Sequence, residues 1–173
     1  MLAPMGSTDA SQSTAERPNR RMDLGIVGAL VQSSFLIQEI VGEIAGEYEL
    51  SIIQARMLGV LSDREPRMAH LAQLLGLSKQ SATGLVDRAE RRGLVRRLSI
   101  PVGDERAVHV TLTGAGRELA EQVTGAIAAR VSAAAADLSE TDRTRLSTLL
   151  SDVVVSDADR HGKDISAPLM APR

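Results

Sequence analysis

The chain has 173 residues, of which 43% are apolar and only 1% aromatic, so its core must be built from Leu, Val, Ile, Ala and Met. Such a core suits packed helices better than a sheet sandwich, and the length suits one domain or one domain with an extension. The absence of cysteine excludes disulfides, thiolate metal sites and thiol-based redox sensing, and a formal net charge of −2 does not by itself favour a nucleic-acid partner.

The two ends of the chain have little structural patterning. Residues 1–20 are rich in Ser, Thr and Pro without periodicity and predict a disordered arm, and residues 159–173 predict a flexible tail. The arm lacks a basic segment followed by an apolar one, so no secretory signal is predicted. The longest uninterrupted apolar runs, such as Leu24 to Val31, are far shorter than the roughly 18–20 residues of a membrane span. We therefore expect a cytoplasmic protein with no membrane partner.

The first ordered element is a long helix over residues 22–48. Its apolar residues follow the helical spacing in a main stripe of Ile26, Val27, Leu30, Val31, Ile37, Val41, Ile44 and Ala45. The stripe is widened beyond a single face by Leu24, Phe35, Leu36 and Ile40. A helix that is apolar on two faces needs two partners, and a second subunit is one way to supply the other.

Two shorter helices follow. Ser51 and Gln54 have the spacing of a capping box and predict the start of a helix that ends before Pro66. A third helix is predicted over residues 68–75, where Gly76 ends it in the manner of a C-terminal glycine.

A turn of about three residues leads to Ser78, which is predicted to cap a fourth helix that stops at Gly93. Two helices joined in this way form a helix-turn-helix pattern, although helical hairpins are common in helical proteins. Residues 94–100 and 107–112 are predicted to pair as strands around a turn at residues 101–104. In the second strand, three apolar residues are expected to be buried and to alternate with two polar ones, in the order Val108, His109, Val110, Thr111 and Leu112.

Two further helices complete the order. Thr113 is predicted to cap a long helix, and Ser139, with Asp142 at the capping-box position, is predicted to begin the last one. The fold class is therefore mainly α, with six helices and a two-stranded β wing.

The helix after Ser78 has the pattern of a DNA recognition helix. Its core face holds Ala82, Leu85, Val86 and Ala89, and its opposite face holds Gln80, Gly84, Asp87 and Arg91, flanked by Ser81, Thr83 and Arg88. Short polar side chains at its start suit base edges in the major groove, and Gly84 removes a side chain where the backbone can approach DNA. The amides near Ser78 and Lys79 would favour a phosphate. An ordinary solvated helix remains the alternative.

Basic charge is concentrated on this region. Residues 76–100 hold six basic and two acidic residues, whereas the other 148 residues hold 14 basic and 20 acidic ones. Arg96 and Arg97 precede the predicted hairpin turn and Arg106 follows it, so Arg106 is expected to contact DNA at the wing tip, in a minor groove. The alternative is that these arginines are solvated, or paired with Asp104 and Glu105.

The same residues carry a family resemblance. Residues 104–116 resemble the D-x-R…LT-x-x-G signature of the MarR (multiple antibiotic resistance regulator) family, and residues 85–97 and 71–78 fit the same template. The resemblance spans roughly residues 22–157. It implies an obligate homodimer formed by the N- and C-terminal helices, a palindromic double-stranded DNA operator, and often a small-molecule effector that weakens DNA binding.

With this resemblance, the chain divides into dimerisation helices at residues 21–48 and 113–158 and a DNA-binding domain at residues 50–112. Two features depart from the family pattern: Glu105 is acidic where the family often has a base, and the loop at residues 100–103 is apolar. Asp87 faces the presumed DNA but is acidic, so we expect it to pair with a wing arginine, and we assign Asp104 to wing support as well.

The resulting hypothesis is a transcriptional regulator, a repressor released by an effector. Phe35 is a candidate for lining an effector pocket, although a core position at a dimer interface is the simpler interpretation. His70, His109 and His161 show no ligand spacing, so neither a metal nor another cofactor is expected. No arrangement typical of an enzyme is present. The alternative function is a winged-helix module for protein interaction, or for non-specific architectural DNA binding without an effector.

Overall fold

The computed structural model describes residues 22–102 and 105–162, except for the side chains of residues 100–102, 105 and 106. The predicted N-terminal arm and Asp104 lie outside this part of the chain, as does the predicted tail beyond residue 162. Within the described residues the order is six helices and one hairpin: α1 (Gly25–Glu47), α2 (Ile52–Asp63), α3 (Met68–Leu75), α4 (Lys79–Arg91), β1 (Val95–Val102), β2 (Glu105–Leu112), α5 (Gly114–Ala134) and α6 (Glu140–His161). The predicted fold class is confirmed.

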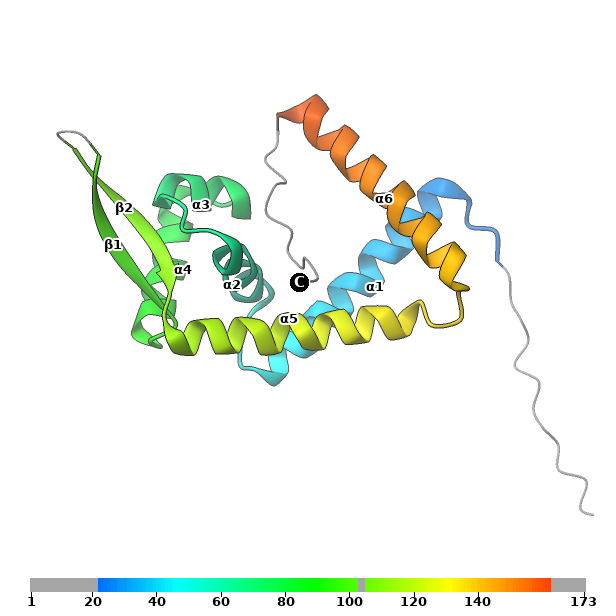
Figure 1. Cartoon of the computed structure of the whole chain (residues 1–173), viewed down its shortest axis with the longest axis horizontal. Coiled ribbons are helices and arrows are strands. Elements are labelled where there is room, and N and C mark those ends of the chain that lie inside the picture. The colour runs from blue at the N-terminus through cyan, green and yellow to red at the C-terminus, as the bar shows by residue number, and fades with distance from the viewer. Residues whose placement is uncertain (1–21, 103–104, 163–173) are drawn as a thin grey trace, which may run out of the picture.

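The core lies in a lobe at one end of the molecule (Figure 1). The end of α1, most of α2, the inner faces of α3 and α4, the start of β1, the end of β2 and the first two-thirds of α5 contribute to it. Its largest fully buried side chains are Ile40, Met57, Leu58, Leu71, Leu85, Val86, Val95, Val110 and Val123. The hairpin projects from the outer edge of this lobe as a wing, and α5 runs from its base toward α6.

The predicted helix caps are present. Ser51 Oγ accepts a hydrogen bond from the amide of Gln54, whose side chain accepts one from the Ser51 amide, so the capping box is complete. Gly76 ends α3 with a φ of +65°, a left-handed conformation that glycine adopts without steric cost. Ser78 Oγ then accepts from the amide of Ser81 and starts α4. These caps fix the tight turn between α3 and α4.

The wing differs from its prediction in length and in burial. β1 continues through Pro101 and Val102 of the predicted turn, and β2 already begins at Glu105, so that Val102 lies opposite Glu105 and Pro101 opposite Arg106. The expected alternation in β2 is wrong at two positions: Val108 is 40% exposed, and Thr111 is only 2% exposed. Val108 lies on the part of the wing that projects beyond the core.

A segment that the sequence analysis missed explains why Thr111 is buried. The residues just before α3 lie against β2: the amide of Val110 donates to the carbonyl of Pro66, and Arg67 forms an isolated bridge with His109. Thr111 Oγ1 donates to Glu65 Oε1 at 2.6 Å, which satisfies the buried hydroxyl. His109 Nδ1 lies 2.7 Å from the carbonyl oxygen of Glu65 and must carry its proton there, since a carbonyl only accepts. The wing is therefore anchored along a third segment.

The junction between the wing and α5 depends on one glycine. A Cβ added at Gly116 would lie 1.8 Å from the carbonyl oxygen of Leu94, so no other residue fits without a backbone shift. Thr113 caps α5 at the same place, and its hydroxyl also donates to the carbonyl of Gly93 at 2.6 Å. The threonine and glycine of the LT-x-x-G stretch thus have a structural role: they pack the start of α5 on the base of the wing.

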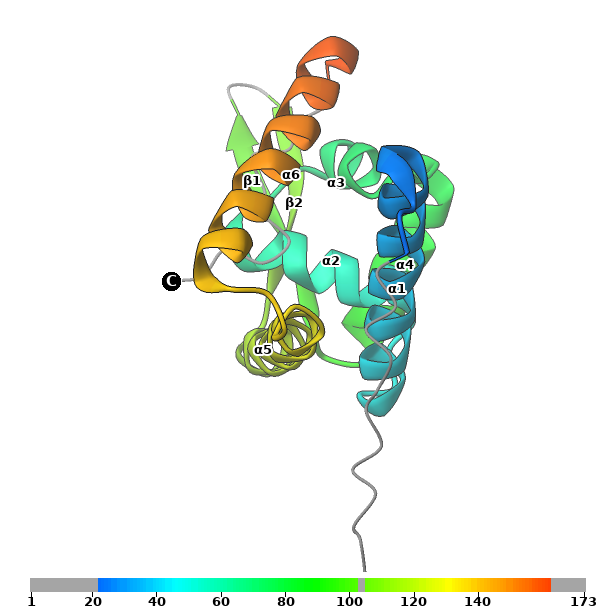
Figure 2. The same ribbon diagram turned by 90° about the vertical axis from the view of Figure 1, so that its right-hand side faces the viewer.

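The first half of α1 and the apolar face of α6 have no cover within the described chain. Ile26 is 71% exposed, Val27 73% and Phe35 58%, whereas Ile40, which we placed outside the main stripe, is only 1% exposed. On α6 the uncovered residues are Leu146, Leu149, Leu150, Val153, Val154 and Val155. The two helices overlap in Figure 1 but stand on opposite sides of the molecule in Figure 2, so they do not cover each other.

By length and mean hydropathy alone, α1 is long and apolar enough to cross a membrane. Only 11% of its 18-residue apolar stretch is buried within the described structure. Counting uninterrupted apolar runs missed this property, because glycines and a few polar residues divide the runs. At the other end of the chain, α6 continues to His161, past residue 159 where we expected the tail to begin.

Candidate nucleic-acid interface

The exposed face of α4 carries the predicted DNA-contacting residues. Lys79, Gln80, Ser81, Thr83 and Arg88 are exposed, and Gly84 is half-buried. The opposite face packs into the core through Ala82, Leu85, Val86 and Ala89, as the helical spacing predicted. The helix is therefore held by one face while its other face meets solvent.

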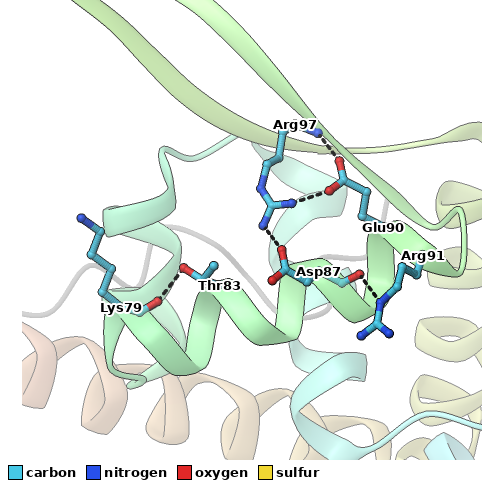
Figure 3. A network of polar contacts seen from close by, with 6 residues as sticks. All are labelled: Lys79, Thr83, Asp87, Glu90, Arg91 and Arg97. Carbon is cyan, nitrogen blue, oxygen red and sulfur yellow. Dashed lines mark hydrogen bonds and ion pairs between the residues drawn. The ribbon is translucent and has the colours of Figure 1, made fainter.

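Several of these polar groups already have partners. Ser78 Oγ donates to Ser81 Oγ at 2.9 Å, and Thr83 Oγ1 donates to the carbonyl oxygen of Lys79 at 2.8 Å (Figure 3). Arg91 Nε donates to the carbonyl of Asp87 at 3.3 Å, which folds this side chain back along the helix. A hydroxyl whose proton is engaged can still accept a hydrogen bond, so Thr83 is restricted to an acceptor role in this conformation.

Arg97 joins the wing to α4. From β1, its guanidinium reaches down to α4, where Nη2 donates to Asp87 Oδ1 at 2.5 Å and Nη1 donates to Glu90 Oε2 (Figure 3). The backbone amide of Arg97 donates to Glu90 Oε1 at 3.2 Å. The expected pairing of Asp87 with a wing arginine is therefore present. We name this trio of Asp87, Glu90 and Arg97 the wing strut.

The wing strut changes the interpretation of two residues. Arg97 was expected to contact DNA, but its guanidinium is held by two carboxylates and its side chain is only 28% exposed. Partial burial lowers its pKa, but the hydrogen bonds and charges of Asp87 and Glu90 outweigh that effect, and the net direction is upward. Glu90 was not predicted as a functional residue. The sequence could have indicated Glu90, because it lies one turn after Asp87 on the same helix and an arginine follows on the next strand.

The neighbouring arginines differ in their surroundings, and one of them, Arg92, was not among the predicted DNA contacts. Arg96, next to Arg97 in the strand, is exposed. Arg92, at the end of α4, donates through Nη1 to the carbonyl oxygen of Glu49 at 2.8 Å, and so links α4 to the junction between α1 and α2. Glu49 has a φ of +55°, a left-handed conformation that is uncommon outside glycine. The side chain of Arg106 is not among those described, although its backbone pairs with Pro101 in the wing.

Within residues 22–102 and 105–162, no group of three or more His, Asp or Glu side chains is placed to hold a metal ion. A helix-turn-helix whose second helix exposes polar and basic groups, braced to a basic β-hairpin, defines a winged helix-turn-helix protein that binds DNA.

Comparisons with known proteins show which family the chain is similar to. A model of the MarR family matches residues 48–107, which include α2 to α4 and most of the wing. The transcriptional regulator PecS of Dickeya dadantii is 28% identical over 140 residues, which are 78% of this chain and 84% of PecS. The chain is thus similar to the MarR family over its helix-turn-helix and wing, and that family consists of transcriptional regulators.

Solved structures show the same fold. RV1404 of Mycobacterium tuberculosis is 28% identical, covers 74% of this chain and 89% of its own, and superposes with a TM-score of 0.63. A second Mycobacterium tuberculosis protein of the MarR family, RV2887, was solved in complex with salicylic acid. It is 21% identical, with a TM-score of 0.61 and coverage of 75% of this chain and 96% of its own.

Proposed function

We propose that this regulator binds a palindromic operator as a homodimer, represses transcription by occupying it, and releases it when a small-molecule effector binds. In each subunit α4 lies in a major groove and the wing tip lies in the neighbouring minor groove. The observation that carries the proposal is the wing strut, because it holds a solvent-facing recognition helix and a basic hairpin in one fixed relative orientation.

The uncovered faces of α1 and α6 support the dimer. Soluble monomers rarely expose contiguous apolar patches of more than a few hundred Å². Val27 on α1 is 73% exposed and Leu149 on α6 is 54% exposed, and both helices continue this exposure over several turns. A second copy of the chain presents the same two faces, so each subunit can cover the other through an isologous interface.

A membrane would account for less of this surface. The last turns of α1 are buried in the lobe, where Ile44 is 7% exposed and Ala45 is fully buried. The remaining faces of α6 carry acidic, basic and hydroxyl side chains. A bilayer could cover the first half of α1 but not both faces, whereas a partner subunit covers α1 and α6 together. We therefore propose a cytoplasmic protein.

The DNA contacts divide into two kinds. We propose that Lys79, Arg91, Arg96 and Arg106 contact phosphates or the minor groove, that Gln80, Ser81, Thr83, Gly84 and Arg88 face base edges, and that Ser78 positions the start of α4. Asp104 stays a proposed wing support. Arg97 supports the wing rather than touching DNA, because its hydrogen bonds are already directed at Asp87 and Glu90.

The effector would act on the spacing of the two recognition helices. A dimer reads two half-sites only when these helices lie about 34–36 Å apart, so a ligand that favours another spacing weakens binding. The salicylic acid bound to the related fold suggests a small aromatic carboxylate as a first probe. Phe35 is the proposed aromatic contact, and it becomes enclosed only when a second subunit covers α1.

The experiment is footprinting on the DNA upstream of the protein's own gene, followed by titration with salicylate and related phenolic carboxylates. We expect a protected region with two-fold symmetry that disappears as an effector is added. Protection without symmetry would contradict the dimer. Uniform weak protection of all DNA would favour the architectural alternative, and no protection at all would favour the protein-interaction alternative.

A further inference from the structure

The side chains on the exposed face of α4 differ in how much hydrogen-bonding capacity they keep for base edges. Ser78 and Ser81 bond to each other, Thr83 donates to the backbone, and Asp87 is held in the wing strut. The side chains of Gln80 and Arg88 are exposed and make no hydrogen bond or ion pair within the described part of the chain. Both side chains carry a planar, two-pronged set of hydrogen-bonding groups, which base-pair edges match in the major groove.

Gly84 lies between them on the same face, one turn from each, since residues four apart on a helix lie nearly above one another. Its φ is not positive, and a Cβ built on it would meet only Arg88 Nη1, at the ordinary contact distance of 3.6 Å. Nothing within the described chain therefore requires glycine here, although glycine weakens a helix interior compared with alanine. A glycine with no internal reason on an exposed helix face is typical of a close approach by another molecule.

The position of Arg88 adds to this. Its Nη1 lies over the bare backbone of Gly84, because long helical side chains lean toward the N-terminus of their helix. The guanidinium thus sits one turn nearer to Gln80 than the Arg88 backbone does. Gln80, Gly84 and Arg88 form one continuous strip, which we name the reading strip.

We propose that the reading strip sets the operator sequence: Gln80 reads the adenine of an A·T pair, Arg88 reads the guanine of a G·C pair, and Gly84 lets the helix approach close enough for both contacts. Glutamine pairs with adenine N6 and N7, and arginine with guanine O6 and N7. This inference rests on the proposed function, and it names the base pairs that the proposed function leaves open.

The geometry also sets the spacing of the two base pairs. Eight residues of α-helix rise about 12 Å, and the backward lean of Arg88 shortens the distance by up to one turn of about 5.4 Å. At about 3.4 Å per base pair, the adenine and the guanine lie roughly two to four base-pair steps apart in each half-site.

The first test is selection of binding sites from a random duplex library with the wild-type protein and with Gln80→Ala and Arg88→Lys. We expect the wild-type motif to contain the adenine and the guanine at this spacing. Gln80→Ala should lose preference only at the adenine, by about 5- to 150-fold, the value of one bidentate base contact. Arg88→Lys should weaken preference only at the guanine, and by less, because an ammonium can still donate to O6 and N7 but lacks the planar fork of a guanidinium. Lysine keeps the charge, so the salt dependence of binding should not change with Arg88→Lys.

The second test is Gly84→Ala, with Gly46→Ala in α1 as the control, since a Cβ at Gly46 meets nothing and one at Gly84 meets only Arg88 Nη1 at an ordinary contact distance. We expect Gly84→Ala to raise the midpoint of thermal unfolding by about 2–4 °C and yet weaken operator binding by at least about fivefold. Gly46→Ala should leave binding unchanged. A stabilised Gly84→Ala that binds its operator like wild type would overturn the close approach.

The selection experiment can reject the reading strip without rejecting the proposed function. A wild-type motif without this adenine and guanine pair, or one unchanged by both variants, overturns the reading strip but leaves a sequence-specific regulator. If no motif is enriched and binding is the same on all duplexes, the proposed function itself fails.

Discussion

Replacing Arg97 with alanine separates two roles that a wing arginine could have. If Arg97 contacts a phosphate, its loss should remove one counterion-releasing contact from each subunit. If it supports the wing, its loss should leave the number of phosphate contacts unchanged but free the hairpin to move relative to α4. The structure favours support, because three of the donors on Arg97 are directed at Asp87 and Glu90.

The size of the effect follows from these contacts. The side chains are 28% exposed for Arg97, 49% for Asp87 and 39% for Glu90, so solvent screens the ion pairs and each contributes little. Alanine keeps the backbone amide that donates to Glu90, so only the two side-chain contacts are lost, and we expect a loss of about 1–2 kcal/mol in the free energy of unfolding. DNA binding must then supply the same free energy to order the wing, so affinity should fall about tenfold at fixed salt.

The assay is fluorescence anisotropy on one operator duplex over a salt series, with protein concentration fixed. For Arg97→Ala we expect a parallel line of log affinity against log salt, shifted to weaker binding. Arg96→Ala is the matched control on the neighbouring, exposed residue, and its line should be shallower by about 1.8 for a dimer that loses two phosphate contacts. Asp87→Ala should also weaken binding, although it removes a negative charge that faces DNA.

Two results would refute the supporting role. One is a slope for Arg97→Ala that is shallower by the same amount as for Arg96→Ala. The other is tighter binding by Asp87→Ala, which would show that its carboxylate acts only by repelling phosphate.

Three other substitutions test separate parts of the structure. Gly116→Ala should destabilise the fold by about 3 kcal/mol, at the upper end for overpacking, because its Cβ would overlap the Leu94 carbonyl. Denaturant unfolding measures this loss, and a value below about 1 kcal/mol would show that α5 can move away from the wing. Leu149→Glu should convert the protein to a monomer at micromolar concentration in sedimentation velocity, and an unchanged mass would place the interface elsewhere. Arg92→Ala removes the hydrogen bond to the Glu49 carbonyl and should weaken the effect of an effector on DNA affinity. Without effector, DNA affinity should change about threefold or less. An unaltered effector response would exclude this hydrogen bond as a route between α1 and α4.

Local signals in the sequence predicted the elements of the lobe well. The capping box at Ser51, the glycine after α3 and the hydroxyl caps at Ser78 and Thr113 act within a few residues, and all are present. The inner face of α4 also followed from spacing alone. These features depend on helix geometry, which is the same wherever the helix lies in a protein.

The misplaced features depend on contacts between distant residues. Thr111 is buried because Glu65, 46 positions earlier, accepts its hydrogen bond, and no local pattern marks that partner. Val108 is exposed because the wing extends past the core, so alternation within the strand could not place it. In α1, Ile26 and Ile40 look alike in the helical pattern, but only Ile40 reaches the lobe of its own chain.

The candidate site was predicted in part for the same reason. The residues of the recognition helix and the pairing of Asp87 with an arginine followed from the face of α4 and its charges. Which arginine pairs, and that Glu90 shares it, depends on the register of β1 over α4. Arg97 was therefore assigned to DNA, because in the sequence it looks the same as its exposed neighbour Arg96.

The most direct test of DNA recognition by α4 and the wing is the salt dependence of wild-type binding to its operator. Three to five phosphate contacts in each subunit predict that log affinity falls against log salt with a slope of about −5 to −9 for the dimer. If the chain acts only on other proteins and makes no phosphate contacts, log affinity for DNA should show a slope near zero against log salt. That result would contradict DNA binding through this face.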